Sequence, residues 1–219
     1  DVEHTRRLPV AFKRARTEEQ IRDRRDEILN ACSLLYDKKG FEGVTVKEIA
    51  RLTSFSRPSV YNYYATKEEI LLDLLLREYR KWGQELSKFF LSSVETDKNT
   101  FCRILAQSLT RHEKMMKLIS LNLNSIENNC RDQKLEDFKR ELLPFFDILS
   151  GGIRKFFPHA SSADIRLFIT AFTAYYQGLY PLTHPSGKQL KAMKGAGFRE
   201  FGSFEPLCRA GISLLVSGL

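Results

Sequence analysis

The chain has 219 residues, of which 42% are hydrophobic and 28% are charged, an ordinary balance for a globular protein with a buried core. Its formal net charge of +8 suits a polyanionic partner, although the excess is not concentrated in the first 80 residues. No apolar run reaches the length of a membrane span, and the start DVEHTRRLPV lacks the apolar core of a secretory signal. We therefore expect a cytoplasmic protein with no membrane partner.

The cysteines are scattered along the sequence without CxxC spacing, and three of them lie in apolar helical patterns. This distribution favours free thiols in a reducing compartment over disulfides or a redox switch. The four residues are Cys32, Cys102, Cys130 and Cys208.

Residues 1–16 have no helical period and are predicted to form a flexible basic arm, which either contacts DNA or is only a tail. A helix is predicted from Thr17, which forms a capping-box pattern with Gln20. Its end is predicted at Gly40, which follows two lysines.

Residues 45–67 have the pattern of a helix-turn-helix that runs into a third helix. Thr45 begins the first helix, which has an apolar face at helical spacing, and a polar break follows it at residues 53–55. Ser56 is a good N-cap for the second short helix. That helix is loaded with polar and aromatic donors, which indicates a surface built to touch DNA. These residues are Arg57, Ser59, Tyr61, Asn62 and Tyr63.

This segment resembles the DNA-binding domain of TetR-family transcriptional regulators over roughly residues 17–70. The matching positions are Thr45-Val46, Ile49-Ala50, Ser56, Val60-Tyr61, Tyr63-Tyr64 and Lys67. One departure is the turn Thr53-Ser54-Phe55, where the family often has Ala-Gly-Val. If position 54 requires a positive φ, serine carries a steric cost there that glycine does not.

The resemblance implies binding to double-stranded DNA through particular side chains. Arg57 is predicted to read a guanine edge, with Ser59 and Asn62 as secondary base contacts. Lys47 is predicted to reach a base or a phosphate. The family's phosphate-contacting positions correspond to Thr45, Tyr61, Tyr63 and Lys67. Tyr61 has an alternative interpretation as half-buried packing, and Phe55, Val60 and Tyr64 are predicted to be core.

Further helical patterns occupy the rest of the chain and no strand pattern competes with them, so the predicted fold is all-α. A long helix is predicted from Thr66 to about Phe90. The others are expected near residues 99–111, 114–128, 134–157, 162–182 and 203–217, with a short helix at Gln189–Lys194. We divide the chain into an arm, a helix-turn-helix domain over 17–66 and a larger helical domain over 67–219 for effector binding and dimerisation.

By resemblance, the protein is expected to act as a homodimer on a palindromic operator in a bacterium. The patterns at 162–182 and 203–217 are the predicted dimer elements, with domain core as the alternative. An apolar or aromatic effector is expected in a pocket among the aromatic helices, where core packing is again the alternative. The predicted pocket residues are Asn122, Phe145, Phe172, Tyr175, Tyr176 and Gln177.

The sequence therefore predicts a DNA-binding transcriptional regulator, by family default a repressor that an effector releases. The alternative is a helical small-molecule-binding protein without DNA binding. An enzyme is not expected, because the histidines stand alone and HExxH, GxSxG, P-loop and GxGxxG patterns are missing from the sequence. No metal, cofactor or catalytic residue is predicted.

Overall fold

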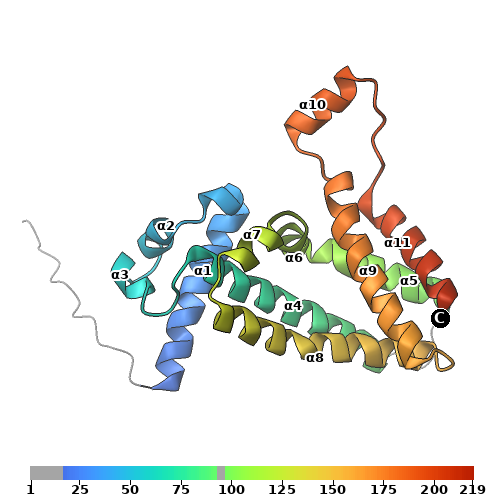
Figure 1. Ribbon diagram of the computed structural model, residues 1–219, viewed down its shortest axis with the longest axis horizontal. Coiled ribbons are helices and arrows are strands. Elements are labelled where there is room, and N and C mark those ends of the chain that lie inside the picture. Colours follow the sequence, from blue (N-terminus) through green and yellow to red (C-terminus); the bar gives the residue numbers. More distant parts are fainter. Residues whose placement is uncertain (1–16, 93–96) are drawn as a thin grey trace, which may run out of the picture.

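The computed structural model describes residues 17–92 and 97–219, and every regular element in these ranges is helical (Figure 1). The predicted all-α class is confirmed. The predicted basic arm, residues 1–16, lies outside the described residues. None of the described helices is long and apolar enough to cross a membrane.

The first helix, α1 (Glu18–Gly43), begins where the sequence predicts, because the Thr17 hydroxyl accepts a hydrogen bond from the Gln20 amide at 3.2 Å. Gly40 has a φ of 67°, a left-handed conformation that glycine adopts without steric cost. The predicted end at Gly40 is therefore a kink, and one further turn runs to Gly43.

Two short helices follow, α2 (Val46–Arg51) and α3 (Arg57–Val60). The α3 helix is shorter than the sequence pattern suggested. Beyond Val60 the amides of Asn62 and Tyr63 bond to carbonyls three residues back, so this stretch is a series of turns. Phe55, Val60 and Tyr64 are buried, which confirms the predicted core of this region.

The long helix α4 (Lys67–Ser92) connects the N-terminal helices to the rest of the molecule. It packs along α8 (Asp132–Phe156) and also contacts α1, as Figure 1 shows. Its apolar face supplies the central tryptophan, Trp82, which has no exposed surface.

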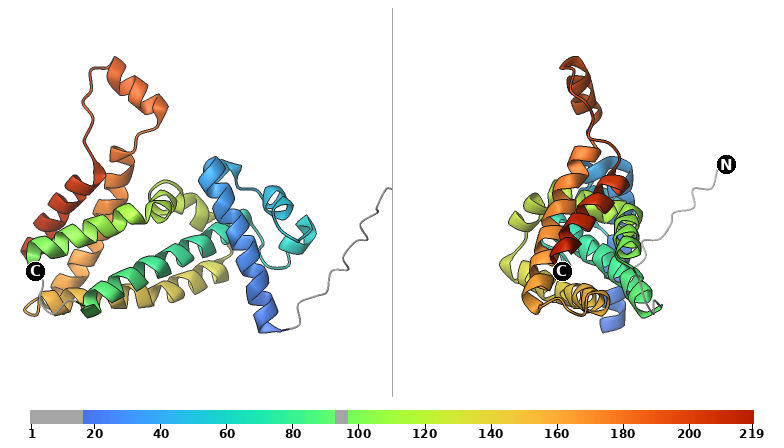
Figure 2. Two further views of the ribbon diagram at one scale, coloured as in Figure 1. Left: turned by 180° about the vertical axis from the view of Figure 1, so that it is seen from behind. Right: turned by 90° about the vertical axis from the view of Figure 1, so that its right-hand side faces the viewer.

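The remaining helices extend from beside α1 to the end of the molecule opposite α3 (Figure 1). The chain from α5 (Lys98–Arg111) continues through α6 (Glu113–Lys117), a π-helical turn η1 (Leu118–Asn122) and α7 (Leu123–Asn128). After α8 come α9 (Ser162–Thr183), α10 (Gly187–Gly195), α11 (Phe204–Leu215) and a 3₁₀ turn η2 (Val216–Gly218). The α11 helix packs against α5 and α9, whereas α10 stands away from the body (Figure 2).

The core of the bundle is aromatic and surrounds Trp82. Phe145, Phe172 and Tyr176 lie with their ring centroids 4.8, 6.5 and 5.9 Å from the Trp82 ring. The indole N–H donates to the Ser108 hydroxyl at 2.9 Å, and that hydroxyl donates to the Leu105 carbonyl at 2.8 Å. Both polar groups are fully buried and both are satisfied, as stable burial requires.

The cysteines are free thiols, as predicted. Cys32, Cys102 and Cys208 are buried and Cys130 is half-buried. Burial raises the pKa of the Cys32 thiol to about 12, so this group is inert at neutral pH.

Candidate nucleic-acid interface and effector groove

The predicted DNA-contacting residues lie on the surface formed by α2, α3 and the turns after α3. Lys47, Arg57 and Asn62 are exposed, and Tyr61 is 45% exposed. The Arg57 guanidinium carbon lies 6.0 Å from the centre of the Tyr61 ring, so these two side chains form one cationic and aromatic patch. This patch offers forked donors and a phenol to solvent.

Three other predicted contacts are partly engaged within the chain. The Thr45 hydroxyl caps α2 by accepting from the Glu48 amide at 3.1 Å. Ser59 is buried, and its hydroxyl lies 2.8 Å from that of Ser56. Tyr63 is half-buried and packs edge-on against Phe55 at 6.0 Å between ring centroids. Ser59 therefore presents little surface to a base and supports the turn before α3.

The unusual turn at residues 53–55 carries no backbone strain. No non-glycine residue in the described ranges has a positive φ, so serine has no steric cost at position 54. Instead, the Glu27 carboxylate of α1 accepts hydrogen bonds from both the amide and the hydroxyl of Ser54. Sequence reasoning missed Glu27, because nothing local links it to a turn 27 residues away.

Lys67, at the start of α4, is held against the end of α1. Its ammonium group lies 4.4 Å from the centre of the Phe41 ring, and it donates to the Phe41 carbonyl at 3.4 Å. The side chain is only partly exposed. A phosphate contact therefore requires Lys67 to exchange this carbonyl for a phosphate oxygen.

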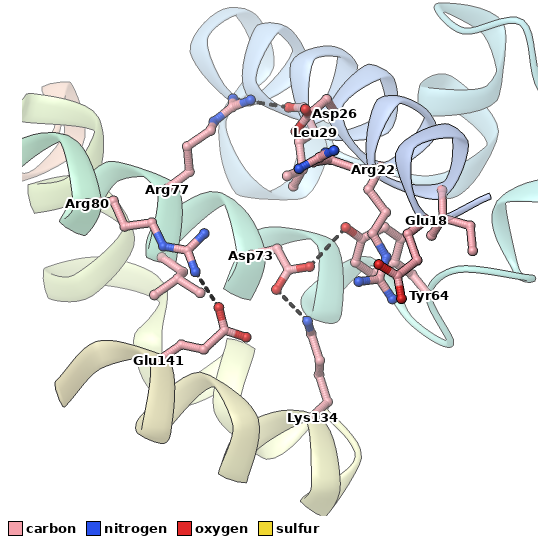
Figure 3. A pocket seen from close by; sticks show the side chains of 13 residues that line it. Glu18, Arg22, Asp26, Leu29, Tyr64, Asp73, Arg77, Arg80, Lys134 and Glu141 are labelled. Atoms are coloured by element: carbon pink, nitrogen blue, oxygen red, sulfur yellow. Dashed lines mark hydrogen bonds and ion pairs between the residues drawn. The ribbon is translucent and has the colours of Figure 1, made fainter. Parts of the chain in front are cut away.

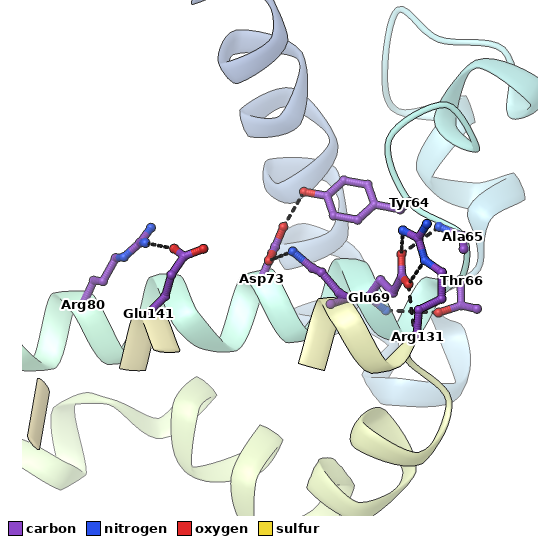
Figure 4. A network of polar contacts seen from close by, with 9 residues as sticks. Tyr64, Ala65, Thr66, Glu69, Asp73, Arg80, Arg131 and Glu141 are labelled. Atoms are coloured by element: carbon purple, nitrogen blue, oxygen red, sulfur yellow. Dashed lines mark hydrogen bonds and ion pairs between the residues drawn. The ribbon is translucent and has the colours of Figure 1, made fainter. Parts of the chain in front are cut away.

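The turn before α4 is bonded to the α7–α8 turn through a buried carboxylate (Figure 4). Glu69 is fully buried and accepts from the Ala65 amide at 2.8 Å. The Arg131 side chain donates to the same carboxylate at 2.6 and 2.9 Å, and the Arg131 amide at 3.3 Å. Burial alone would raise the pKa of Glu69, but these hydrogen bonds outweigh it and hold the pKa below the ordinary value.

A second set of contacts lies one turn further along α4. Asp73 accepts from the Tyr64 hydroxyl at 2.9 Å and from the Lys134 ammonium of α8. Thr66 also donates to the Asn129 carbonyl at 3.0 Å. We call these residues the joint: Tyr64, Ala65, Thr66, Glu69, Asp73, Asn129, Arg131 and Lys134. The joint connects the end of the helix-turn-helix to the start of α8.

A groove begins at the joint and continues along the seam between α4 and α8, and Figure 3 shows its polar part. Its polar part has a volume of about 520 Å³ and is lined by charged side chains of α1, α4 and α8. Its apolar part, of about 330 Å³, shares Leu76, Arg80 and Glu141 with the polar part. The apolar part is also lined by Tyr79, Gly83, Leu142, Pro144, Phe145 and Ile148.

Of the predicted pocket residues, Phe145 alone lines the apolar groove between α4 and α8. Phe145 borders the apolar groove, while Phe172 and Tyr176 pack beside Trp82 in the core. Tyr175 faces α11 and donates to the Leu207 carbonyl at 2.7 Å. Asn122 accepts from the Tyr36 hydroxyl of α1 at 2.8 Å, and Gln177 is half-buried. The aromatic stripe is thus mainly core, which was the alternative interpretation.

Comparison with known families agrees with this architecture. The profile of "Bacterial regulatory proteins, tetR family" matches residues 28–74, and that of "Tetracyclin repressor-like, C-terminal domain" matches residues 76–219. The chain therefore belongs to the TetR family of transcriptional regulators, whose N-terminal domain is a DNA-binding helix-turn-helix. The border between the two matches lies inside α4, which belongs to both parts.

Individual relatives are distant. The chain is 33% identical over 64 residues to the regulator QacR of Staphylococcus aureus. This match covers 29% of this chain and only 34% of QacR. It is 24% identical over 143 residues to the repressor KstR2 of Mycobacterium tuberculosis, covering 62% of this chain and 70% of KstR2.

Solved structures share the fold at low identity. The fatty acid degradation regulator FadR from Bacillus halodurans superimposes with a TM-score of 0.57 and 17% identity, covering 89% of this chain and 98% of FadR. FadR from Bacillus subtilis, solved in complex with stearoyl-CoA, gives a TM-score of 0.55 and 15% identity over 89% of this chain and 98% of that one. These similarities define the fold and leave the effector open.

Proposed function

We propose that this protein is a homodimeric repressor whose α2–α3 surface binds a palindromic operator and which an apolar small molecule releases from DNA. The helix-turn-helix match at residues 28–74 carries the proposal, together with the exposed patch of Arg57 and Tyr61. In this division residues 17–66 bind DNA, and residues 67–219 bind the effector and the second copy.

In the proposed complex, the chemistry of each side chain's hydrogen-bond donors decides whether it contacts a base or a phosphate. Arg57 has a planar fork of N–H groups and is placed at a guanine edge, with Asn62 as the neighbouring base contact. Lys47, Tyr61, Tyr63, Lys67 and Thr45 contact phosphates, which fix register without reading sequence. Ser59 acts indirectly by holding Ser56 and the turn before α3.

The dimer forms through the outer faces of α9 and α11. Leu167 of α9 is 69% exposed and Leu214 of α11 is 76% exposed, and the two side chains line one apolar hollow. Exposed small residues continue the stripe along α9, where helix backbones can approach closely. This α9–α11 face consists of Leu167, Ala174, Gly178, Leu182 and Leu214. A face of this kind is covered in a stable dimer.

The effector binds in the apolar groove between α4 and α8. The groove lies beside the joint, and Leu76, Arg80 and Glu141 line both of its parts. A ligand that spreads α4 from α8 displaces Arg131 and Lys134 relative to Glu69 and Asp73. That displacement moves the helix-turn-helix domain. The ligand therefore favours a state in which the two helix-turn-helix domains of the dimer no longer match the spacing of the operator.

The test is selection of bound duplexes from a random pool, followed by titration of Arg57→Ala, Lys67→Ala and Arg103→Ala. Arg57→Ala is expected to lose about 1–3 kcal/mol of discrimination at one base position. Lys67→Ala should weaken binding to cognate and scrambled DNA by the same factor and should make binding less dependent on salt concentration. Arg103, exposed on α5, is the control for loss of one positive charge.

Equal losses on cognate and scrambled duplexes for Arg57→Ala would remove its role in base readout. A wild-type protein that selects no sequence at low salt would overturn the proposal as a whole. A thermal-shift screen of apolar compounds then finds the effector, and a hit must also release DNA.

A further inference from the structure

An excursion of the chain between α9 and α11 contains α10 (Figures 1 and 2). Both of its ends are pinned to the body by an aromatic cluster. The Tyr180 and His184 rings stack with centroids 4.1 Å apart, and the Phe204 ring lies 6.0 and 5.9 Å from them. The excursion, residues 185–203, therefore leaves the body from a fixed root.

The sequence of this segment specifies its own local structure. Ser186 and Gln189 form a reciprocal capping box at the start of α10. At the other end, the amides of Gly197 and Phe198 bond to the carbonyls of Lys194 at 3.2 Å and Met193 at 2.8 Å. With Gly197 at a φ of 68°, this is the paired-bond stop of a Schellman motif.

Yet the helix rests on nothing within the described chain. No residue of α10 is buried. From Ser186 to Ser203 every residue is exposed except Met193, which is half-buried. An isolated helix shorter than about 12 residues is marginal in water. Ordering its residues costs backbone entropy, and no burial within the described chain offsets that cost.

The exposed side chains show what kind of surface is missing. Phe198 is 55% and Phe201 49% exposed, and their rings contact each other at 5.7 Å. Leu190 is also exposed on α10. These apolar groups call for a protein surface, because a nucleic acid contacted through the segment's lysines would leave them in water.

We propose that residues 185–203 form an arm that packs on a second copy of the chain. The inference rests on the proposed homodimer and adds a second contact to it. The root of the arm lies where α9 ends and α11 begins, and these are the two helices that carry the α9–α11 face. A copy docked on that face therefore lies within reach, and two-fold symmetry gives each copy one arm and one receiving surface.

Amide hydrogen exchange of the full-length protein at several concentrations tests the arm directly. In the dimer, the amides of α10 are expected to be protected, and dilution below the dimerisation constant should remove that protection. A dimer in which these amides exchange at unprotected rates would overturn the arm while leaving the dimer intact. Protection that persists in the monomer, or that requires DNA, would also overturn it. A protein that is monomeric at every concentration would remove both proposals.

Photo-crosslinking identifies the partner surface. With p-benzoylphenylalanine at position 198, irradiation is expected to give a covalent dimer in high yield. The same group at position 143, an exposed leucine on α8, serves as the control. Equal yields at the two positions, or crosslinks only within one chain, would contradict the arm.

Weakening the arm should also weaken the dimer. The double variant Leu190→Ser with Phe198→Ser is expected to raise the dimer dissociation constant at least about tenfold, because two apolar side chains lose their burial. Leu143→Ser removes a similar exposed side chain and should leave the constant unchanged. Since α10 contributes nothing to the core of one chain, the variant monomer keeps its fold and an unchanged constant would refute the proposal.

Discussion

Gly151 and Gly152 are adjacent residues of α8 with opposite surroundings. A methyl group added at Gly151 would meet nothing within 4 Å. At Gly152 it would overlap the ring of Phe90, which is buried and stacks near Phe101. The pair therefore separates helix propensity from packing within a single turn.

Gly152→Ala is expected to destabilise the protein by about 1–3 kcal/mol, because the Phe90 ring must move within a filled core. Gly151→Ala, the matched control, should stabilise it by about 0.5–1 kcal/mol through better helix propensity. Thermal or urea unfolding of both variants measures the difference. A Gly152→Ala variant as stable as Gly151→Ala would show that α4 and α8 separate easily at this point.

At the level of single residues, exposure was easier to predict than contact. The sequence pattern placed Arg57 and Tyr61 on the surface and Phe55, Val60 and Tyr64 in the core, as observed. The pattern did not predict that Ser59 is buried, because a small polar residue in the first turn of a helix fits either a buried or an exposed position. Ser54 also showed no local sign of its partner Glu27.

At the level of elements, helix positions followed closely from periodicity and capping residues. Thr17, Ser56 and Thr66 accept the expected amides, because a cap depends only on residues three positions away. The π-helical turn η1 was not predicted inside the 114–128 pattern. The turn packs against α9, and its Asn122 accepts a hydrogen bond from Tyr36; sequence periodicity does not report such long-range contacts.

In the joint too, the local feature could be predicted from the sequence, whereas the contact between distant residues could not. Glu69 lies in the first turn of the helix predicted from Thr66, but its partner Arg131 lies 62 positions away, beyond any local pattern. Local patterns also give no sign of the apolar groove apart from Phe145. Phe145 reaches it only because α4 and α8 run side by side.

Arg131→Ala tests the joint. The change leaves the Glu69 carboxylate buried without its guanidinium, and we expect a measurable loss of stability at neutral pH. The pKa of Glu69 is lowered in the wild type, so its contribution is present above the ordinary pKa near 4.5 and is lost as pH falls through the lowered value. The deficit of the variant should therefore shrink on acidification, as urea titrations at pH 7 and pH 4 would show.

The control for that experiment is Arg140→Ala on the same helix. Arg140 pairs with Glu136 and Asp137, but all three side chains are well exposed. We expect a change within about 0.5 kcal/mol at either pH. A deficit for Arg131→Ala that does not vary with pH would contradict the role assigned to Glu69.

At the level of the whole molecule, the proposed homodimer makes DNA binding depend on two copies. Leu214→Asp should give a monomer, because it places a carboxylate on the α9–α11 face while leaving the core of one chain untouched. Sedimentation should show the monomer, and affinity for a palindromic operator should fall far more than affinity for a half-site. Leu143→Asp, on the outer side of α8, should behave as the wild type in both assays.

The whole-molecule arrangement also limits what a sequence can reveal. The division into two domains followed from motif, length and helical pattern, but the seam that holds the groove follows from how α4 lies on α8. An effector pocket is a property of packed surfaces, and a list of aromatic residues does not describe how those surfaces meet.

The chain contains a single tryptophan, and its indole lies in the centre of the bundle. The ring is 4.8 Å from that of Phe145, which also lines the apolar groove, and the neighbouring Gly83 borders the same groove. The protein thus carries its own optical reporter beside the proposed effector site. Titrating a bound compound should shift the emission of Trp82 and should leave it unchanged for a compound that releases DNA by binding elsewhere.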